Sequence, residues 1–142
     1  MSSYEFIYPS VLESEGKMLK DMLQILKKHG VDGLSRHSML VVISEAFSNA
    51  LVHGNRLDPS KQIKIAVDIN KNEMTADIID EGQGGLEKIS RRKPSETWAE
   101  NGRGIGIMGH YAASVEFFEM TDGGLRVSIR FKREHTNVVN SR

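Results

Sequence analysis

The stretch Ser-Glu-Ala-Phe-Ser-Asn-Ala-Leu-Val-His-Gly-Asn, residues 44–55, determines how we interpret the rest of the chain. On a helix, with about 100° per residue, the apolar side chains in and just before it form one stripe that faces a core. These residues are Leu40, Ile43, Phe47, Ala50 and Leu51. Glu45, Asn49 and His53 follow one another at every fourth position on the opposite side. A carboxylate, an amide and an imidazole in line can handle a metal ion, a proton or a phosphate, although most such lines are solvated polar faces.

The composition limits the classes of protein to which the chain can belong. Its 142 residues predict one domain, which we place at 1–133, followed by a polar tail at 134–142. The absence of cysteine excludes thiolate catalysis and fits a reducing compartment. The 19 basic and 19 acidic residues cancel, so no net field attracts nucleic acid or an anionic membrane. Because there is neither a signal sequence nor an apolar run of about eighteen residues, we expect a cytoplasmic protein.

Hydrophobic periodicity predicts two helices and a sheet. Apolar residues at helical spacing predict one helix from about Val11 to Lys28 and a second from about 33–35 to Gly54. Alternating residues predict strands at 4–8, 63–69, 74–80, 114–120 and 125–131. Strands joined by tight turns must be antiparallel. The expected fold class is therefore an α/β two-layer sandwich, with one mixed, largely antiparallel sheet and helices on one face.

Two glycine clusters come after the predicted strand at 74–80, one directly at its end and one after a long loop. Asp80 lies at a strand end beside Gly82 and Gly84, where its carboxylate could accept a hydrogen bond from an exocyclic amine. Residues 86–101 show no period and predict a long loop, which is either a binding element or a surface excursion. The cluster Gly-Arg-Gly-Ile-Gly at 102–106 then opens a predicted short helix at 107–112. Glycines at a helix N-terminus let backbone N–H groups approach a phosphate.

Three motifs in this order resemble those of the GHKL ATPase superfamily, which binds ATP in the Bergerat fold. The residues Glu45-x-x-x-Asn49-Ala50-x-x-His53-Gly54 resemble its N box. Asp80-x-Gly82-x-Gly84 resembles the first glycine box, and Gly102-x-Gly104-Ile105-Gly106 resembles the second. Each motif alone is a weak signal, whereas all three in order form a strong one. Within the superfamily, the chain is most similar to the small stand-alone serine kinases that act as anti-sigma factors.

The resemblance implies a role for each motif residue. Asn49 would ligate Mg²⁺ through its amide oxygen, and Glu45 would orient or deprotonate the attacking hydroxyl or a water. Asp80 would read the adenine amine of ATP. Arg103 would either neutralise charge on the transferred phosphoryl group or point into solvent, and His53 would either join the site or close the helix. The glycine boxes would hold the nucleotide: Gly82 and Gly84 beside the base, and Gly102, Gly104, Ile105 and Gly106 around the phosphates.

The resemblance also implies a function. The chain would be a Mg-ATP-dependent serine/threonine-protein kinase that acts as an anti-sigma factor in a partner-switching pathway and phosphorylates a STAS-domain antagonist. Its partners would be that antagonist, a sigma factor and a second copy of the chain, with no nucleic acid or membrane. Three alternatives stay open: an ATP-binding switch that captures a partner without phosphotransfer, the detached ATP-binding domain of a histidine kinase, and an interaction domain without nucleotide. A helical hairpin with a phosphoacceptor histidine is missing from the sequence, which argues against the histidine kinase.

Overall fold

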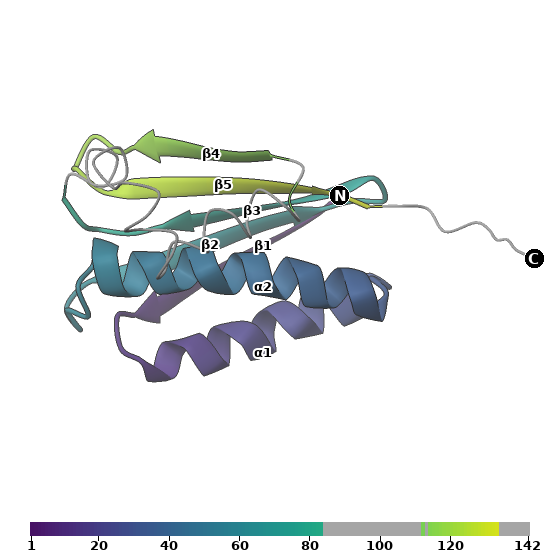
Figure 1. Ribbon diagram of the computed structural model, residues 1–142, viewed down its shortest axis with the longest axis horizontal. Coiled ribbons are helices and arrows are strands. Elements are labelled where there is room, and N and C mark those ends of the chain that lie inside the picture. Colours follow the sequence, from purple (N-terminus) through teal and green to yellow (C-terminus); the bar gives the residue numbers. More distant parts are fainter. Residues whose placement is uncertain (84–111, 113, 134–142) are drawn as a thin grey trace, which may run out of the picture.

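The computed structural model describes residues 1–83, 112 and 114–133, and within them five strands and two long helices form two layers (Figure 1). In chain order the elements are β1 (Ser2–Pro9), α1 (Glu13–Lys28), α2 (Gly33–Asn49), the π-helical turn η1 (Ala50–Gly54), β2 (Gln62–Ile69), β3 (Glu73–Ile79), β4 (Ser114–Glu119) and β5 (Leu125–Lys132). The strand order is β1-β2-β3-β5-β4, and each neighbouring pair is antiparallel. The expected two-layer α/β sandwich is confirmed. Its sheet contains no parallel pair among the described strands, so the parallel part of a mixed sheet is not found there.

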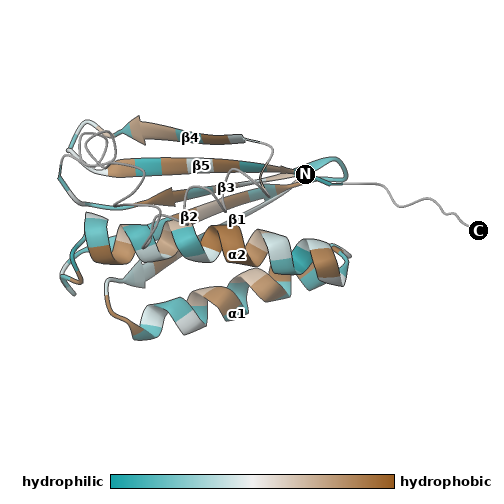
Figure 2. Cartoon of the chain, in the orientation of Figure 1, coloured by the Kyte–Doolittle hydropathy of each residue, from teal (hydrophilic) through white to brown (hydrophobic). Residues whose placement is uncertain are grey.

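Alternation along the strands decides which face of the sheet the helices cover. Every second residue of β2 is buried: Ile63, Ile65, Val67 and Ile69. Both helices lie on one side of the sheet (Figure 1), and both carry hydrophobic as well as hydrophilic residues along their length (Figure 2). Met18, Met22 and Phe47 fill the space between the layers at 0%, 1% and 0% exposure. Because each buried side chain of this size contributes about 1.5–3 kcal/mol, the core fixes α2 firmly against the sheet.

Local hydrogen bonds set the first residues of the two helices. α1 begins at Glu13 rather than near Val11, and the hydrogen bond from the N–H of Ser14 to the carbonyl of Val11, at 3.0 Å, forms the turn that leads into it. α2 begins at Gly33, as expected. Its N-cap is Asp32, whose Oδ1 accepts a hydrogen bond from the backbone N–H of Ser35 at 2.9 Å. This bond holds the pKa of Asp32 below its usual value.

The second helix widens after Asn49. The N–H of Asn55 donates to the carbonyl of Ala50 at 2.8 Å, and this hydrogen bond over five residues defines the π turn η1. The expected end at Gly54 is confirmed. The predicted line of Glu45, Asn49 and His53 assumes a regular α-helix up to His53, whereas the structure has the π turn η1 after Asn49. The alignment of His53 with the other two side chains stays a prediction.

Several predictions concern residues that the structure does not describe. They are the loop at 86–101, nearly all of the short helix at 107–112 and the polar tail at 134–142. Neither of the long helices that are described is long and apolar enough to cross a membrane.

Candidate functional site

Glu45 and Asn49 lie one turn apart on α2, and both side chains are partly exposed. The opposite side of the same helix buries Ile43 and Phe47 completely. The ring of Phe47 meets the ring of Tyr8 from β1 edge-on, with centroids 5.6 Å apart. α2 therefore presents a carboxylate and an amide from a well-anchored helix.

The surroundings of Glu45 favour the protonated form of its carboxyl group. Burial raises the pKa of Glu45, and the negative charge of Glu15 on α1 raises it further. Glu15 is itself held in place by Ser44, whose Oγ donates to Glu15 Oε2 at 2.9 Å. A carboxylate with a raised pKa takes a proton more readily, which suits Glu45 to act as a base toward a hydroxyl group. The sequence assigns no role to Glu15, because only the packing of α1 against α2 brings the two carboxylates together.

Asp80 lies directly after β3 and is 4% exposed. Its Oδ1 accepts two backbone hydrogen bonds, from the N–H of Gly82 at 2.9 Å and from the N–H of Leu125 at 3.0 Å. The N–H of Asp80 in turn donates to the carbonyl of Leu125 at 3.0 Å. Hydrogen bonds to an ionised group are strong, so this carboxylate is held in a fixed direction at the start of β5.

The end of the N box lies directly against Asp80. A Cβ atom added to Gly54 would overlap Asp80 Oδ2 and lie 2.6 Å from Asp80 Cγ. A Cβ added to Gly82 would overlap the carbonyl oxygen of Gly54 and lie 2.7 Å from its carbon. Only glycine fits at either position without a shift of the neighbour. The structure thus brings the first two predicted motifs together: Asn49 precedes Gly54 by roughly 7 Å along the helix axis.

The donor set determines what kind of metal ion fits here. Asn49 offers an amide oxygen, and the carboxylate of Glu45 lies one turn away on α2. In the part of the chain that the structure describes, no group of three His, Cys, Asp or Glu side chains could hold an ion. Mg²⁺ is usually held by one or two side chains together with phosphate oxygens and water. The residues therefore fit Mg²⁺ that arrives with a nucleotide, and they do not form a metal cage of protein ligands.

The remaining site residues lie outside the described part of the chain. They are Gly84, Gly102, Arg103, Gly104, Ile105 and Gly106. Their contacts with the nucleotide stay predictions.

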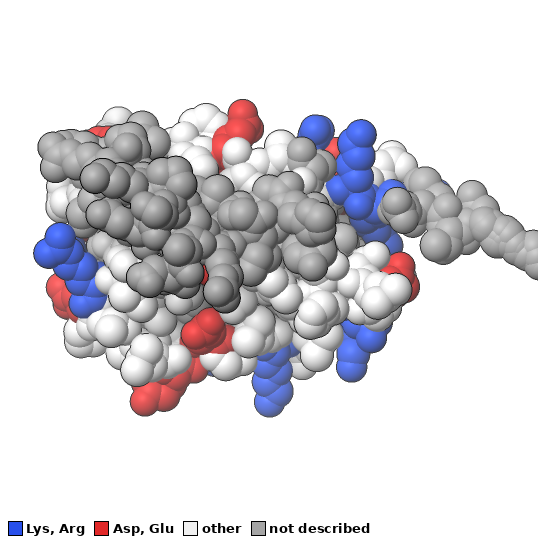
Figure 3. Space-filling model, viewed as in Figure 1, with Lys and Arg blue, Asp and Glu red and all other residues white. Residues whose placement is uncertain are grey.

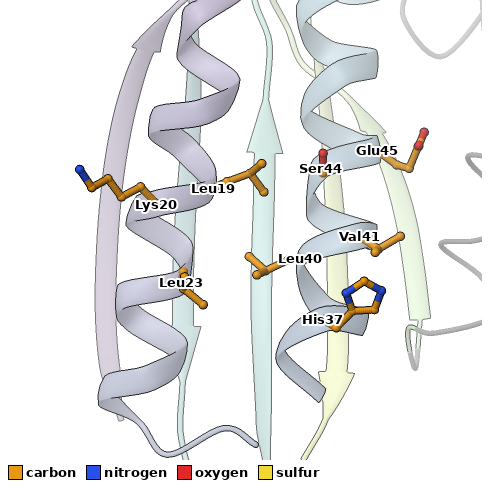
Figure 4. Close-up of a pocket in the computed structure, with 8 residues that line it drawn as sticks. All are labelled: Leu19, Lys20, Leu23, His37, Leu40, Val41, Ser44 and Glu45. Carbon is orange, nitrogen blue, oxygen red and sulfur yellow. The ribbon is translucent and has the colours of Figure 1, made fainter. Parts of the chain in front are cut away.

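An apolar groove runs between α1 and α2 next to Glu45 (Figure 4). Leu19 and Leu23 of α1 and Leu40 of α2 point toward one another across it. Ser44 and Glu45 lie at one end of the groove. On the face of the molecule in Figure 3, acidic and basic side chains are interspersed. Apolar walls beside a carboxylate suit a peptide segment better than a phosphate group.

Asn55 is a buried residue directly after η1, at the start of the connection to β2. It is 1% exposed, and its side-chain amide makes three hydrogen bonds to other segments. Its position directly after the N box is the single sequence signal that could have indicated it, because a polar residue in a turn is normally exposed.

Comparisons with known proteins agree with this geometry. The family model described as Histidine kinase-like ATPase domain matches residues 8–131. An anti-sigma F factor from Clostridium perfringens is 29% identical to the chain over 94 residues, which are 63% of this chain and 67% of that protein.

Two solved structures share the fold. The structure of the RsbU and RsbW domains of Rv1364c from Mycobacterium tuberculosis matches with a TM-score of 0.70 and 14% identity, over 99% of this chain and 35% of that one. A chain of the SiaB-SiaC complex from Pseudomonas aeruginosa matches with a TM-score of 0.59 and 14% identity, over 91% of this chain and 89% of that one. At this level of identity the two likenesses concern the fold alone.

Proposed function

The chain belongs to the histidine kinase-like ATPase domain family, and from this premise we propose that it is a Mg-ATP-dependent serine/threonine-protein kinase that acts as an anti-sigma factor in a partner-switching pathway. One observation carries the proposal. The contact of Gly54 with Asp80 joins the helix that bears Glu45 and Asn49 to the carboxylate suited to read adenine. This contact between the two predicted motifs supports one site for a single nucleotide.

The adenine end of this site is built on Asp80. Its Oδ1 is held by two backbone N–H groups, which fixes the plane of the carboxylate before the base arrives. A carboxylate fixed in this way accepts a hydrogen bond from the 6-amino group of adenine without first having to be ordered. Because Gly54 and Gly82 have no side chains, the end of the N box and the segment after β3 pack directly against each other beside this carboxylate.

The phosphate end is built on α2. Asn49 would hold Mg²⁺, which when bound would neutralise charge on the phosphate oxygens. Glu45 would take the proton from a serine or threonine hydroxyl of the substrate while that oxygen bonds to the γ-phosphorus and the bond to ADP breaks. Burial and the charge of Glu15 raise the pKa of Glu45, which strengthens it as a base. The second glycine cluster would complete this end of the site with Gly102, Arg103 and residues 104–106.

The protein substrate would approach along the groove between α1 and α2. The groove ends at Glu45, so a segment seated between Leu23 and Leu40 could bring a hydroxyl group near the proposed base. The likeness to an anti-sigma F factor supports a sigma factor as one partner. A STAS-domain antagonist is then the proposed phosphate acceptor, and the cytoplasm is the proposed compartment.

Phosphotransfer can be tested with the full chain, labelled ATP, Mg²⁺ and a panel of STAS-domain proteins from the same cell. We expect transfer to one of them and its loss in Glu45→Gln, with ADP binding retained. Glu119→Gln is the matched control, because Glu119 is exposed on β4 at the edge of the sheet. ATP binding without transfer of phosphate to any of these proteins would contradict the proposed kinase activity. If partner capture then survives in Glu45→Gln, the chain is a binding switch.

A further inference from the structure

A pair of buried polar side chains lies behind the proposed nucleotide site, and the proposed function uses neither of them. Among the described residues, the buried polar ones are Ser10, Ser14, Asn55 and Asp80. Asp80 belongs to the site, and Ser14 Oγ donates to the carbonyl of Pro9 at 2.7 Å next to the start of α1. Ser10 and Asn55, at 0% and 1% exposure, are bonded to each other. Burying polar groups costs free energy unless they are hydrogen-bonded, so such a pair needs an explanation.

The side chain of Asn55 joins three segments that are distant in the sequence. Its Nδ2 donates to Ser10 Oγ at 2.8 Å, in the connection from β1 to α1, and to the carbonyl of Gln62 at 2.9 Å, at the start of β2. Its Oδ1 accepts a hydrogen bond from the N–H of Glu81 at 2.7 Å, after the end of β3. Each of these three hydrogen bonds goes to a different segment, so the position of Asn55 is tightly determined.

The neighbouring bonds close this arrangement into a network. Ser10 Oγ donates to the carbonyl of Lys61 at 2.8 Å, and the N–H of Gln62 donates to Glu81 Oε1 at 2.8 Å. The chain then bends sharply, since Arg56 and Leu57 both have positive φ angles, 53° and 56°. Residues other than glycine adopt this conformation only where their surroundings impose it.

We propose that Asn55 is a positioning residue for nucleotide recognition. Glu81 stands between Asp80 and Gly82, and the N–H of Gly82 is one of the two donors that orient the carboxylate of Asp80. By holding the N–H of Glu81, Asn55 keeps this segment against Gly54, beside the carboxylate of Asp80 to which the proposed function assigns adenine. The inference rests on the proposed function, because it assigns Asn55 a role in reading the 6-amino group. A purely structural asparagine would stabilise the fold without affecting that discrimination.

The test measures how strongly the full chain prefers ADP to purine riboside 5′-diphosphate, which lacks the 6-amino group, by titration calorimetry. The wild type should prefer ADP by about tenfold or more, the contribution of a hydrogen bond to a charged group. Asn55→Ala should reduce the preference to about threefold or less. Asn70→Ala is the matched control, because Asn70 Oδ1 also accepts two backbone hydrogen bonds, from Asn72 at 2.8 Å and Glu73 at 3.0 Å, in the turn between β2 and β3. It should keep the full preference.

If Asn55→Ala does not fold, Ser10→Ala provides a second test of the proposal. This variant removes one partner of Asn55 and leaves the amide in place, so an intermediate preference is expected. If the folded variants lose thermal stability but keep the wild-type ratio of affinities, Asn55 is purely structural and the proposal is overturned. An equal loss of preference in Asn70→Ala would overturn the proposal as well, because the ratio of the two affinities would then reflect a general loss of rigidity. A wild type that binds neither nucleotide would instead refute the proposed function.

Discussion

Replacing Gly54 with alanine places a methyl group where the neighbouring atoms leave no space for it. The added Cβ would lie 2.6 Å from Asp80 Cγ and 3.2 Å from Asp80 Cβ, closer than the approach that carbon atoms tolerate. Asp80 cannot move away easily, because its Oδ1 accepts hydrogen bonds from Gly82 and Leu125 and only 4% of the residue is exposed. In Gly54→Ala, either the π turn at the end of α2 shifts or the carboxylate of Asp80 loses its hydrogen bonds to Gly82 and Leu125.

The expected loss of stability follows from these two routes. Overpacking a well-filled site costs about 1–3 kcal/mol, and losing a hydrogen bond to a charged group costs about 1.5–3 kcal/mol. A loss of about 3 kcal/mol is therefore expected for Gly54→Ala. In a domain of about 150 residues each kcal/mol lowers Tm by about 2–4 °C, which predicts a fall of about 10 °C.

Thermal unfolding with and without ADP measures both stability and binding. Saturating ADP, at about a hundred times its Kd, should stabilise the wild type by about 2.7 kcal/mol, and Gly54→Ala should lose most of this gain because Asp80 is displaced. Gly16→Ala is the control. Gly16 lies inside α1 with nothing within 4 Å of an added Cβ, so alanine should stabilise the helix by about 0.5–1 kcal/mol and leave the ADP effect unchanged.

Two results would refute this reasoning. The first is a Gly54→Ala protein that melts within about 1 °C of the wild type, which would mean that the helix end does not press on Asp80. The second is a strongly destabilised Gly54→Ala protein whose stabilisation by ADP is unchanged, which would mean that the contact between Gly54 and Asp80 does not affect nucleotide binding.

Three further predictions concern single side chains. Asp80→Asn should weaken ADP binding about tenfold or more in calorimetry, because a neutral amide accepts a weaker hydrogen bond. Phosphotransfer should rise with pH as Glu45 loses its proton; since burial and Glu15 both raise the pKa of Glu45, Glu15→Gln should lower that pKa and shift the acidic limb of the rate profile to lower pH. Phe47→Ala should lower the free energy of unfolding by about 3–5 kcal/mol in urea titration, because it empties a fully buried site.

Most of the fold can be predicted from the sequence, because burial imposes a period on each element. The alternation of β2 appears in its sequence as Ile63, Ile65, Val67 and Ile69, and the expected strand differs from the observed Gln62–Ile69 by one residue. Helix ends are less predictable. Leu12 extends the apolar pattern of α1 although it is 65% exposed and lies outside the helix, so periodicity alone places the start too early.

The candidate site can be predicted only in part. Motif spacing indicates Glu45, Asn49 and Asp80, and the structure adds that Gly54 joins the two motifs to which they belong. The place of Asn55 after the N box does not reveal its hydrogen bonds, since its partners Ser10 and Glu81 lie 45 and 26 residues away in the sequence. The burial of a polar side chain depends on such distant segments, and no local pattern reports them.

The π turn at the end of α2 has a consequence for how this chain can vary. A π turn holds one more residue than an α-helical turn of the same height, so its geometry depends on the length of the chain as well as on its side chains. Deleting one residue from 50–54 would let the regular helix continue and would draw Gly54 and Asn55 out of register with their partners. We therefore expect this segment to accept substitutions at Val52, which is 39% exposed, far more readily than any insertion or deletion.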